Sequence, residues 1–132
     1  MEKQVKIKLL RYTVDKMSFM LNKSFRPEPG EKIKIKPIFN REITKISDER
    51  FAVTISVSLS NLEKEIPFYL DVQLSGIFHS ENWQEDKFNK FLVKSATDVL
   101  YPYMRSIVTT LTANAHVPPY ILPMVNVEAI FH

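Results

Sequence analysis

The chain has 132 residues, of which 45% are hydrophobic and 25% are charged, and its formal net charge is +3. A chain of this length and ordinary composition can bury a real core, so we expect a single folded domain over residues 1–132 rather than a disordered protein. It contains no cysteine, which excludes a disulfide framework and thiol catalysis and weakens any case for a zinc site.

The N-terminal segment alternates apolar residues with lysines. Val5, Ile7 and Leu9 lie at every second position, which is the period of a β-strand and differs from the unbroken apolar stretch of a signal peptide. The alternation breaks between Val14 and Lys16 and then resumes, so we expect one long, interrupted strand. No stretch approaches the ~20 apolar residues that cross a bilayer. We therefore expect a cytoplasmic protein that does not insert into membranes.

Three further strands are predicted in the first two-thirds of the chain. The second begins near Lys32 and contains Pro37, which cannot donate a ladder hydrogen bond and therefore indicates an edge strand or a bulge. The third, residues 51–60, and the fourth, residues 66–75, alternate apolar with polar residues. Because short turns join these strands, we expect an antiparallel meander with one apolar face, covered by the helices that follow. The predicted fold class is α+β.

Helices are predicted in the last third. Residues 84–93 form a first helical segment, and Ser95 or Thr97 can cap a second one that runs to Asn114. Pro102 either starts or kinks that second helix. Its apolar face is predicted to consist of Ala96, Val99, Leu100, Tyr103, Ile107 and Leu111. Its polar face is predicted to carry Asp98, Arg105, Thr109 and Thr112.

An apolar stretch rich in proline, residues 117–125, follows this helix. Loops are usually polar, but this one contains Tyr120, Ile121, Leu122 and Met124. These side chains either fold back over the sheet as core or form a groove for partners, and both interpretations remain open. A short closing helix is predicted over residues 127–131, with Asn126 as its N-cap.

The sequence offers no set of residues for catalysis or metal binding. His79, His116 and His132 are far apart, and no spacing places two of them on one helical face. The chain has only two glycines and no GxSxG motif, which argues against a phosphate-binding loop and a nucleophile elbow. We therefore expect no enzyme and no cofactor.

Lysines on the first two strands suggest an alternative function. A nucleic-acid-binding sheet could use Lys6, Lys8, Lys32, Lys34 and Lys36, although few aromatic residues accompany them to stack on bases. A solvated face that protects edge strands is the competing interpretation, and we expect no nucleic acid as partner. An enzyme or small-ligand domain is a third alternative, because a sheet covered by helices can enclose a pocket.

Several motifs, in this order and spacing, resemble the SecB family of export chaperones and together cover nearly the whole chain. They are Tyr12-Thr13 with Asp15 and Ser18-Phe19, the turn Phe25-Arg26-Pro27-Glu28, Asp71-Val72-Gln73, Gly76-Ile77-Phe78, Leu100-Tyr101-Pro102-Tyr103 with Arg105, the crossover after Asn114, and the closing run from Val125 to Phe131.

The resemblance implies a four-stranded antiparallel sheet with helices on one face, assembled as a homotetramer that is a dimer of dimers. It also implies ATP-independent holding of unfolded client polypeptides in hydrophobic grooves, without a cofactor. By this resemblance the client-binding candidates are Phe25, Tyr120, Ile121, Leu122 and Met124, to which Phe39 is added on its chemistry alone. The residues that match positions for docking a SecA-type translocase motor are Asp15, Tyr69 and Asp71.

Three departures from the family pattern accompany these matches. The usual members are acidic with an acidic tail, whereas this chain is basic and ends at His132. Met20 stands where a second acidic residue of the motor-docking set is expected. A narrower role, such as guarding an antitoxin in a toxin–antitoxin–chaperone system, is therefore a variant of the same function, and a basic surface would attract acidic clients.

Overall fold

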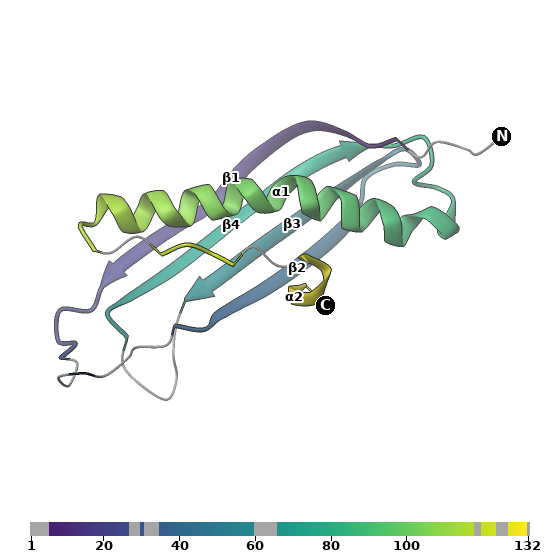
Figure 1. Cartoon of the computed structure of the whole chain (residues 1–132). Helices are drawn as coiled ribbons and strands as arrows, with labels where there is room; N and C mark the ends of the chain where they lie inside the picture. The colour runs from purple at the N-terminus through teal and green to yellow at the C-terminus, as the bar shows by residue number, and fades with distance from the viewer. Residues whose placement is uncertain are drawn as a thin grey trace.

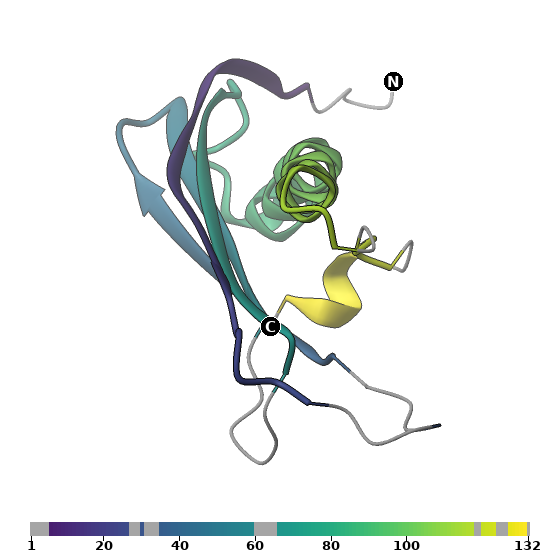
Figure 2. The ribbon, with the colours of Figure 1, turned by 90° about the vertical axis from the view of Figure 1, so that its left-hand side faces the viewer.

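A computed structural model describes residues 6–26, 30, 35–59, 66–117, 120–123 and 127–131. Its elements are β1 (Lys8–Leu21), β2 (Pro37–Lys45), β3 (Arg50–Leu59), β4 (Phe68–His79), α1 (Asp86–Asn114) and α2 (Val127–Ile130). The strands form one antiparallel sheet, and both helices lie on the same side of it (Figures 1 and 2). The predicted α+β class and the sheet covered by helices on one face are confirmed.

The order of the strands is β1-β4-β3-β2, so the predicted meander is wrong. Strands β2, β3 and β4 are sequential neighbours, but β1 pairs with β4, which is the arrangement of a Greek key. The connection over residues 22–36 is long enough to carry the chain from one edge of the sheet to the other. Strand β2 begins at Pro37 rather than near Lys32, and it lies at an edge of the sheet, as the missing N–H group of Pro37 predicted.

Strand β1 is continuous but irregular. Its pairing with β4 shifts register between Leu9 and Arg11 and again between Val14 and Lys16, where the sequence predicted an interruption. Each shift is a β-bulge, which adds a residue to one strand and increases its bend. Figure 1 shows β1 curving along the upper side of the sheet. Asp15 is the extra residue of the second bulge.

The core lies between α1 and the central strands. Alternate residues of β3 and β4 face α1 and are almost completely buried, as the period-two pattern predicted; they include Phe51, Val53, Ile55, Val57, Leu70, Val72, Leu74 and Phe78. A side chain at Gly76 would meet Leu100 Cδ2 at 2.8 Å. Glycine at this position therefore lets α1 pack directly on β4.

Helix α1 is one helix, so the two predicted segments and the cap between them are wrong. Ser95 lies in its interior, and Thr97 Oγ1 donates to the carbonyl oxygen of Val93 at 2.7 Å instead of capping a new helix. Pro102 is also inside the helix. A proline there costs ~3 kcal/mol, which the burial of Leu100 and its neighbours offsets. Local capping and proline signals are therefore weaker here than the continuous apolar stripe.

The buried face of α1 is rotated from the predicted one. Val99 and Tyr103 are exposed, whereas three residues outside the predicted face, Tyr101, Met104 and Val108, are buried. The helix contacts the sheet on one side and the C-terminal residues on another, so its buried sector is displaced toward the second contact. Helix α2 confirms the predicted closing helix, while its expected cap, Asn126, lies outside the described residues.

Candidate functional site

The C-terminal segment, defined as the described residues 120–123 and 127–131, lies beside α1 on the inner side of β2 (Figure 2). Two side chains of α1 bind its backbone. The hydroxyl of Tyr101 donates to the carbonyl oxygen of Pro123 at 2.9 Å, and Nε of Arg105 donates to that of Leu122 at 3.0 Å. Burial raises the pKa of the Tyr101 phenol, so this group remains a donor to higher pH than an exposed tyrosine would.

Two threonines of α1 hold the beginning of the same segment. Oγ1 of Thr109 donates to the carbonyl oxygen of Tyr120 at 3.2 Å, and the N–H of Tyr120 donates to Oγ1 of Thr112 at 2.9 Å. Thr112 is fully buried. Sequence reasoning assigned Arg105 and both threonines to a polar face and missed this function. The spacing of four between Tyr101, Arg105 and Thr109, next to a proline-rich stretch, was the available signal.

These hydrogen bonds determine which apolar side chains of the segment are exposed to solvent. Ile121 is 63% exposed, Tyr120 is half-buried, and Leu122 is fully buried in the core. Leu122 therefore supports the surface from beneath rather than lining it. Met124 lies outside the described residues. The hydroxyl of Tyr120 donates to the carbonyl oxygen of Ile35 at 3.4 Å, and burial raises the pKa of this phenol.

An aromatic cluster joins the end of the segment to β2. The ring of Phe39 lies 5.4 Å from that of Phe131 and 6.2 Å from that of Tyr101, measured between centroids. The guanidinium of Arg41 lies 5.9 Å from the centroid of Phe131. Phe39 is half-buried, so part of this predicted site residue is accessible. Phe25 is also half-buried but lies beyond the end of β1, outside the cluster.

The outer face of the sheet carries no described element (Figure 2), and the three predicted motor-docking residues lie on it. Asp15 accepts hydrogen bonds from Ser75 and, at 2.9 Å, from Thr13. The bond from Ser75 is the main cause that lowers the pKa of this carboxyl. Asp71 accepts a bond from Ser58 and Tyr69 lies two residues before it on β4. Their grouping is observed, while their function stays a prediction.

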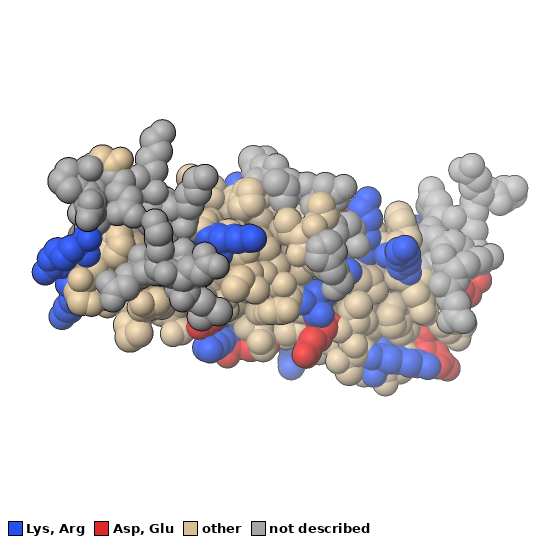
Figure 3. Space-filling view, turned by 90° about the horizontal axis from the view of Figure 1, so that it is seen from below, with Lys and Arg blue, Asp and Glu red and all other residues tan. Residues whose placement is uncertain are grey.

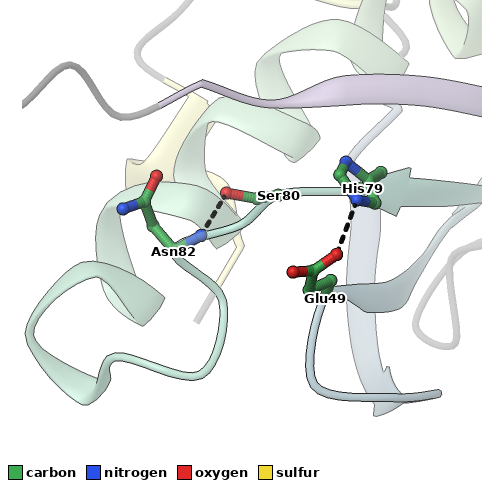
Figure 4. Close-up of polar contacts among 4 residues, drawn as sticks. All are labelled: Glu49, His79, Ser80 and Asn82. Carbon is green, nitrogen blue, oxygen red and sulfur yellow. Dashed lines mark hydrogen bonds and ion pairs between the residues drawn. The ribbon is translucent and has the colours of Figure 1, made fainter.

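A hollow of about 660 Å³ lies at the end of the sheet near the start of β1, lined by residues 6–8 and 79–82. Figure 4 shows two separate polar pairs at this hollow. Nε2 of His79 lies 3.1 Å from Oε2 of Glu49, and the N–H of Asn82 donates to Oγ of Ser80 at 3.2 Å. Among the described residues of the hollow, no hydrogen bond joins Ser80 to His79, so these pairs do not form a nucleophile with its base.

The described lysines do not form one basic patch. Lys6 and Lys8 lie at the start of β1, whereas Lys36 precedes β2 at the opposite edge and opposite end of the sheet. Lys32 and Lys34 lie outside the described residues. On the face seen in Figure 3, Lys and Arg are scattered along the molecule with Asp and Glu between some of them. This arrangement gives the nucleic-acid alternative no support.

Among the described residues, no three His, Cys, Asp or Glu side chains are grouped so that they could hold a metal ion. Within the same ranges, no helix is both long and apolar enough to span a membrane.

Comparison of the sequence with known proteins finds one family model and several relatives. The family described as "Preprotein translocase subunit SecB" matches residues 1–132. An uncharacterized protein of Methanocaldococcus jannaschii, MJ0357, is 33% identical over 94% of this chain and 81% of its own length. The protein-export protein SecB of Acinetobacter baumannii is 32% identical over 66% of this chain. The match spans only 58% of that export protein.

The fold has a solved counterpart. The SecB-like chaperone Rv1957 of Mycobacterium tuberculosis, solved with a ChAD peptide from the antitoxin HigA1, superposes with a TM-score of 0.70 at 16% identity, covering 90% of each chain. A protein of unknown function from Streptococcus agalactiae has a TM-score of 0.57 at 10% identity, covering 92% of this chain and 100% of its own.

Proposed function

This chain belongs to the SecB family, and from that membership we propose that it is an ATP-independent holdase that binds non-native polypeptides in an apolar groove. Membership and fold support a chaperone role in general. In the proposed mechanism, clients are held in the cytoplasm without catalysis or a cofactor. The client-binding surface would combine Ile121, Tyr120 and Phe39, with Phe25 and Met124 as further candidates and Leu122 as their support.

One observation carries the proposal: Ile121 is 63% exposed in a segment whose backbone is fixed by α1. Carbonyl groups on both sides of Ile121 already accept bonds from Arg105 and Thr109. A client would therefore gain contacts with side chains rather than with this backbone. Burying apolar area is worth ~25 cal/mol per Å² and is not directional. Binding of this kind depends on apolar content more than on sequence, as holding varied clients requires.

The assembly we propose is a dimer of dimers, supported by a second apolar surface that we name the open flank. It consists of Tyr12, Val14, Met17 and Leu21 on the inner face of β1, with Val99 and Tyr103 of α1, all exposed. Contiguous exposed apolar area of this kind is typical of contacts between chains. The unpaired edge of β1 lies beside it. A second copy covering this flank would bury both features.

The partners we propose are unfolded polypeptides destined for export or an antitoxin guarded until it assembles. The antitoxin peptide bound by the Mycobacterium tuberculosis chaperone supports the second choice. Asp15, Tyr69 and Asp71 would dock a SecA-type motor if the chain acts in export. Asp15 and Asp71 already accept bonds from serines of the same face.

Suppression of client aggregation tests the holdase. The protein should keep a chemically denatured client soluble on dilution, and Ile121→Ser should weaken this activity several-fold because it removes exposed apolar area. Ile38→Ser is the matched control, because Ile38 is 47% exposed on the outer face of β2. Light scattering measures both. A parent protein that leaves aggregation unchanged, or equal losses in the two variants, contradicts the proposal.

A further inference from the structure

A second hollow lies on the inner side of the sheet, and none of the sequence-predicted client residues lines it. It measures about 360 Å³ and lies between β2 and the first half of α1. We name it the β2–α1 pocket; it is lined by Arg41, Ile43, Trp83, Asn89, Lys90 and Val93. Pockets for small ligands span about 300–1,000 Å³. This one is at the small end, which suits one or two side chains rather than a folded partner.

The base of the pocket is apolar and firmly supported. Trp83 is 8% exposed and its ring stacks on Phe51 with centroids 4.2 Å apart. Val93 is buried beside it, and Ile43 remains 43% exposed at the open end of β2. A large apolar side chain entering here would cover Ile43 without displacing the core.

The rim is cationic. Arg41 and Lys90 come from different elements, and no described lining residue of the pocket is acidic. NH1 of Arg41 donates to Oγ1 of Thr97 at 3.2 Å and its guanidinium lies over Phe131, so its orientation is fixed from two sides. A carboxylate near this rim would be attracted by both cations while Arg41 keeps its bond to Thr97. Because the net charge of the chain is also positive, acidic segments are favoured at longer range.

The pocket is continuous with the proposed client surface along one row of β2. Phe39, Arg41 and Ile43 all face inward, because they pair with the inward-facing residues of β3. Side chains two residues apart on a strand are separated by about 6.6 Å, so Phe39 and Ile43 lie roughly 13 Å apart. An extended client has the same repeat. Its residues i and i+4 would reach the accessible part of Phe39 and the β2–α1 pocket, with residue i+2 opposite Arg41.

We propose that the protein selects extended client segments in which an acidic residue lies between two large apolar residues, at positions i, i+2 and i+4. This inference rests on the proposed holdase function and names the class of client that it prefers. One apolar residue covers the accessible part of Phe39 and the other enters the β2–α1 pocket. The acidic residue lies between Arg41 and Lys90 and distinguishes these clients from basic ones.

Three labelled peptides that share one sequence except at the central position test the preference. Their cores are Phe-Ser-Glu-Ser-Phe, Phe-Ser-Gln-Ser-Phe and Phe-Ser-Lys-Ser-Phe, and their affinities are measured by fluorescence anisotropy. The Glu peptide should bind about tenfold more tightly than the Lys peptide at low salt, and the ratio should shrink as salt screens the charges. Equal affinities overturn the preference but leave the holdase intact, whereas no binding of any peptide contradicts both.

Variants of the protein locate the effect. Arg41→Gln and Lys90→Gln should each reduce the ratio between the Glu and Lys peptides several-fold, and Lys90 is exposed, so its replacement does not threaten folding. Arg11→Gln removes the same charge from the outer face of β1 and should leave the ratio unchanged. An equal reduction in all three variants would show that net charge alone acts, which overturns the assignment to the pocket.

Trp83 supplies a direct reading of occupancy, because it is the only tryptophan of the chain. Two Glu peptides each carry bromophenylalanine at one of the two apolar positions. The peptide whose bromophenylalanine enters the β2–α1 pocket should quench Trp83 emission strongly, and the other peptide should quench it weakly. Lack of quenching from both positions, or equal quenching from both, would show that the side chains do not enter as proposed.

Discussion

The two flanks of α1 are completed in different ways. On the flank toward β2, four hydrogen bonds join described residues of the C-terminal segment to α1, three donated by α1 and one by the N–H of Tyr120, and the ring of Phe131 packs against Phe39. On the flank toward β1, Tyr103 stacks on Tyr12 with centroids 4.7 Å apart, and beyond this pair Val14, Met17 and Leu21 on the inner face of β1 remain exposed. The chain thus covers one apolar flank with its own residues and leaves part of the other exposed.

Under the proposed function, this difference favours separate tasks for the two flanks. A surface whose backbone is already hydrogen-bonded offers scattered side chains, such as Ile121, and suits weak contacts with many sequences. A surface with continuous apolar area next to an unpaired strand edge suits one stable partner. Changes on each flank should therefore affect different properties of the protein.

The largest effect is expected on the open flank. Met17→Glu should reduce the mass of the assembly in solution, because burying an unpaired carboxylate in an apolar contact costs several kcal/mol. Analytical ultracentrifugation measures the mass. Met20→Glu is a closely matched control: Met17 and Met20 are both 60% exposed on β1, but Met20 faces outward. A parent protein that is already a monomer, or dissociation by Met20→Glu alone, would refute the assignment of the open flank.

The contrast between flanks was only partly predictable from sequence. Alternation in β3 and β4 predicted the inner face correctly, and the break predicted between Val14 and Lys16 falls where the continuous strand has a bulge, because both signals are local. Strand order was not predictable in this way, since pairing of β1 with β4 is decided by contacts distant in sequence. The short turns correctly predicted that β2, β3 and β4 pair with their neighbours in sequence, but they gave no information about which strand β1 pairs with.

The C-terminal segment shows a second limit. Four apolar residues in an extended stretch do not reveal which of them face the core, because the orientation is fixed by bonds from α1. Those bonds come from residues such as Arg105 and Thr112, which look like solvent-facing positions when the helix is considered alone. Ile121 and Leu122 therefore had the same expected role and differ completely in exposure.

A moderate effect is expected from Thr112→Val on the covered flank. The variant removes the acceptor for the N–H of Tyr120 and leaves that group without its partner, which costs about 1–3 kcal/mol. Urea unfolding should show the loss of stability, and exchange of the Tyr120 amide should accelerate. Thr110→Val, at an exposed position of the same helix, should change neither quantity. Equal losses in both variants would mean that valine in α1, rather than the lost bond, destabilises the protein.

The smallest effect is expected on the outer face, which neither flank contacts. The bond from Ser75 holds the pKa of Asp15 below its usual 3.8. Ionised Asp15 therefore stabilises the folded state above that pH, and this contribution is lost as the pH falls through the folded-state pKa. In Asp15→Asn the stability should fall less steeply with acid below about pH 4, as measured by urea unfolding across that range.

Asp98→Asn on the exposed surface of α1 is the control, because the same chemical change there removes no described hydrogen bond. Its stability should follow the acid dependence of the parent. Asp15→Asn should also leave both the mass of the assembly and the suppression of aggregation unchanged, since Asp15 lies on neither flank of α1. A change in client holding would instead connect the outer face to the covered flank through β4, and the two faces of the sheet would then no longer be independent.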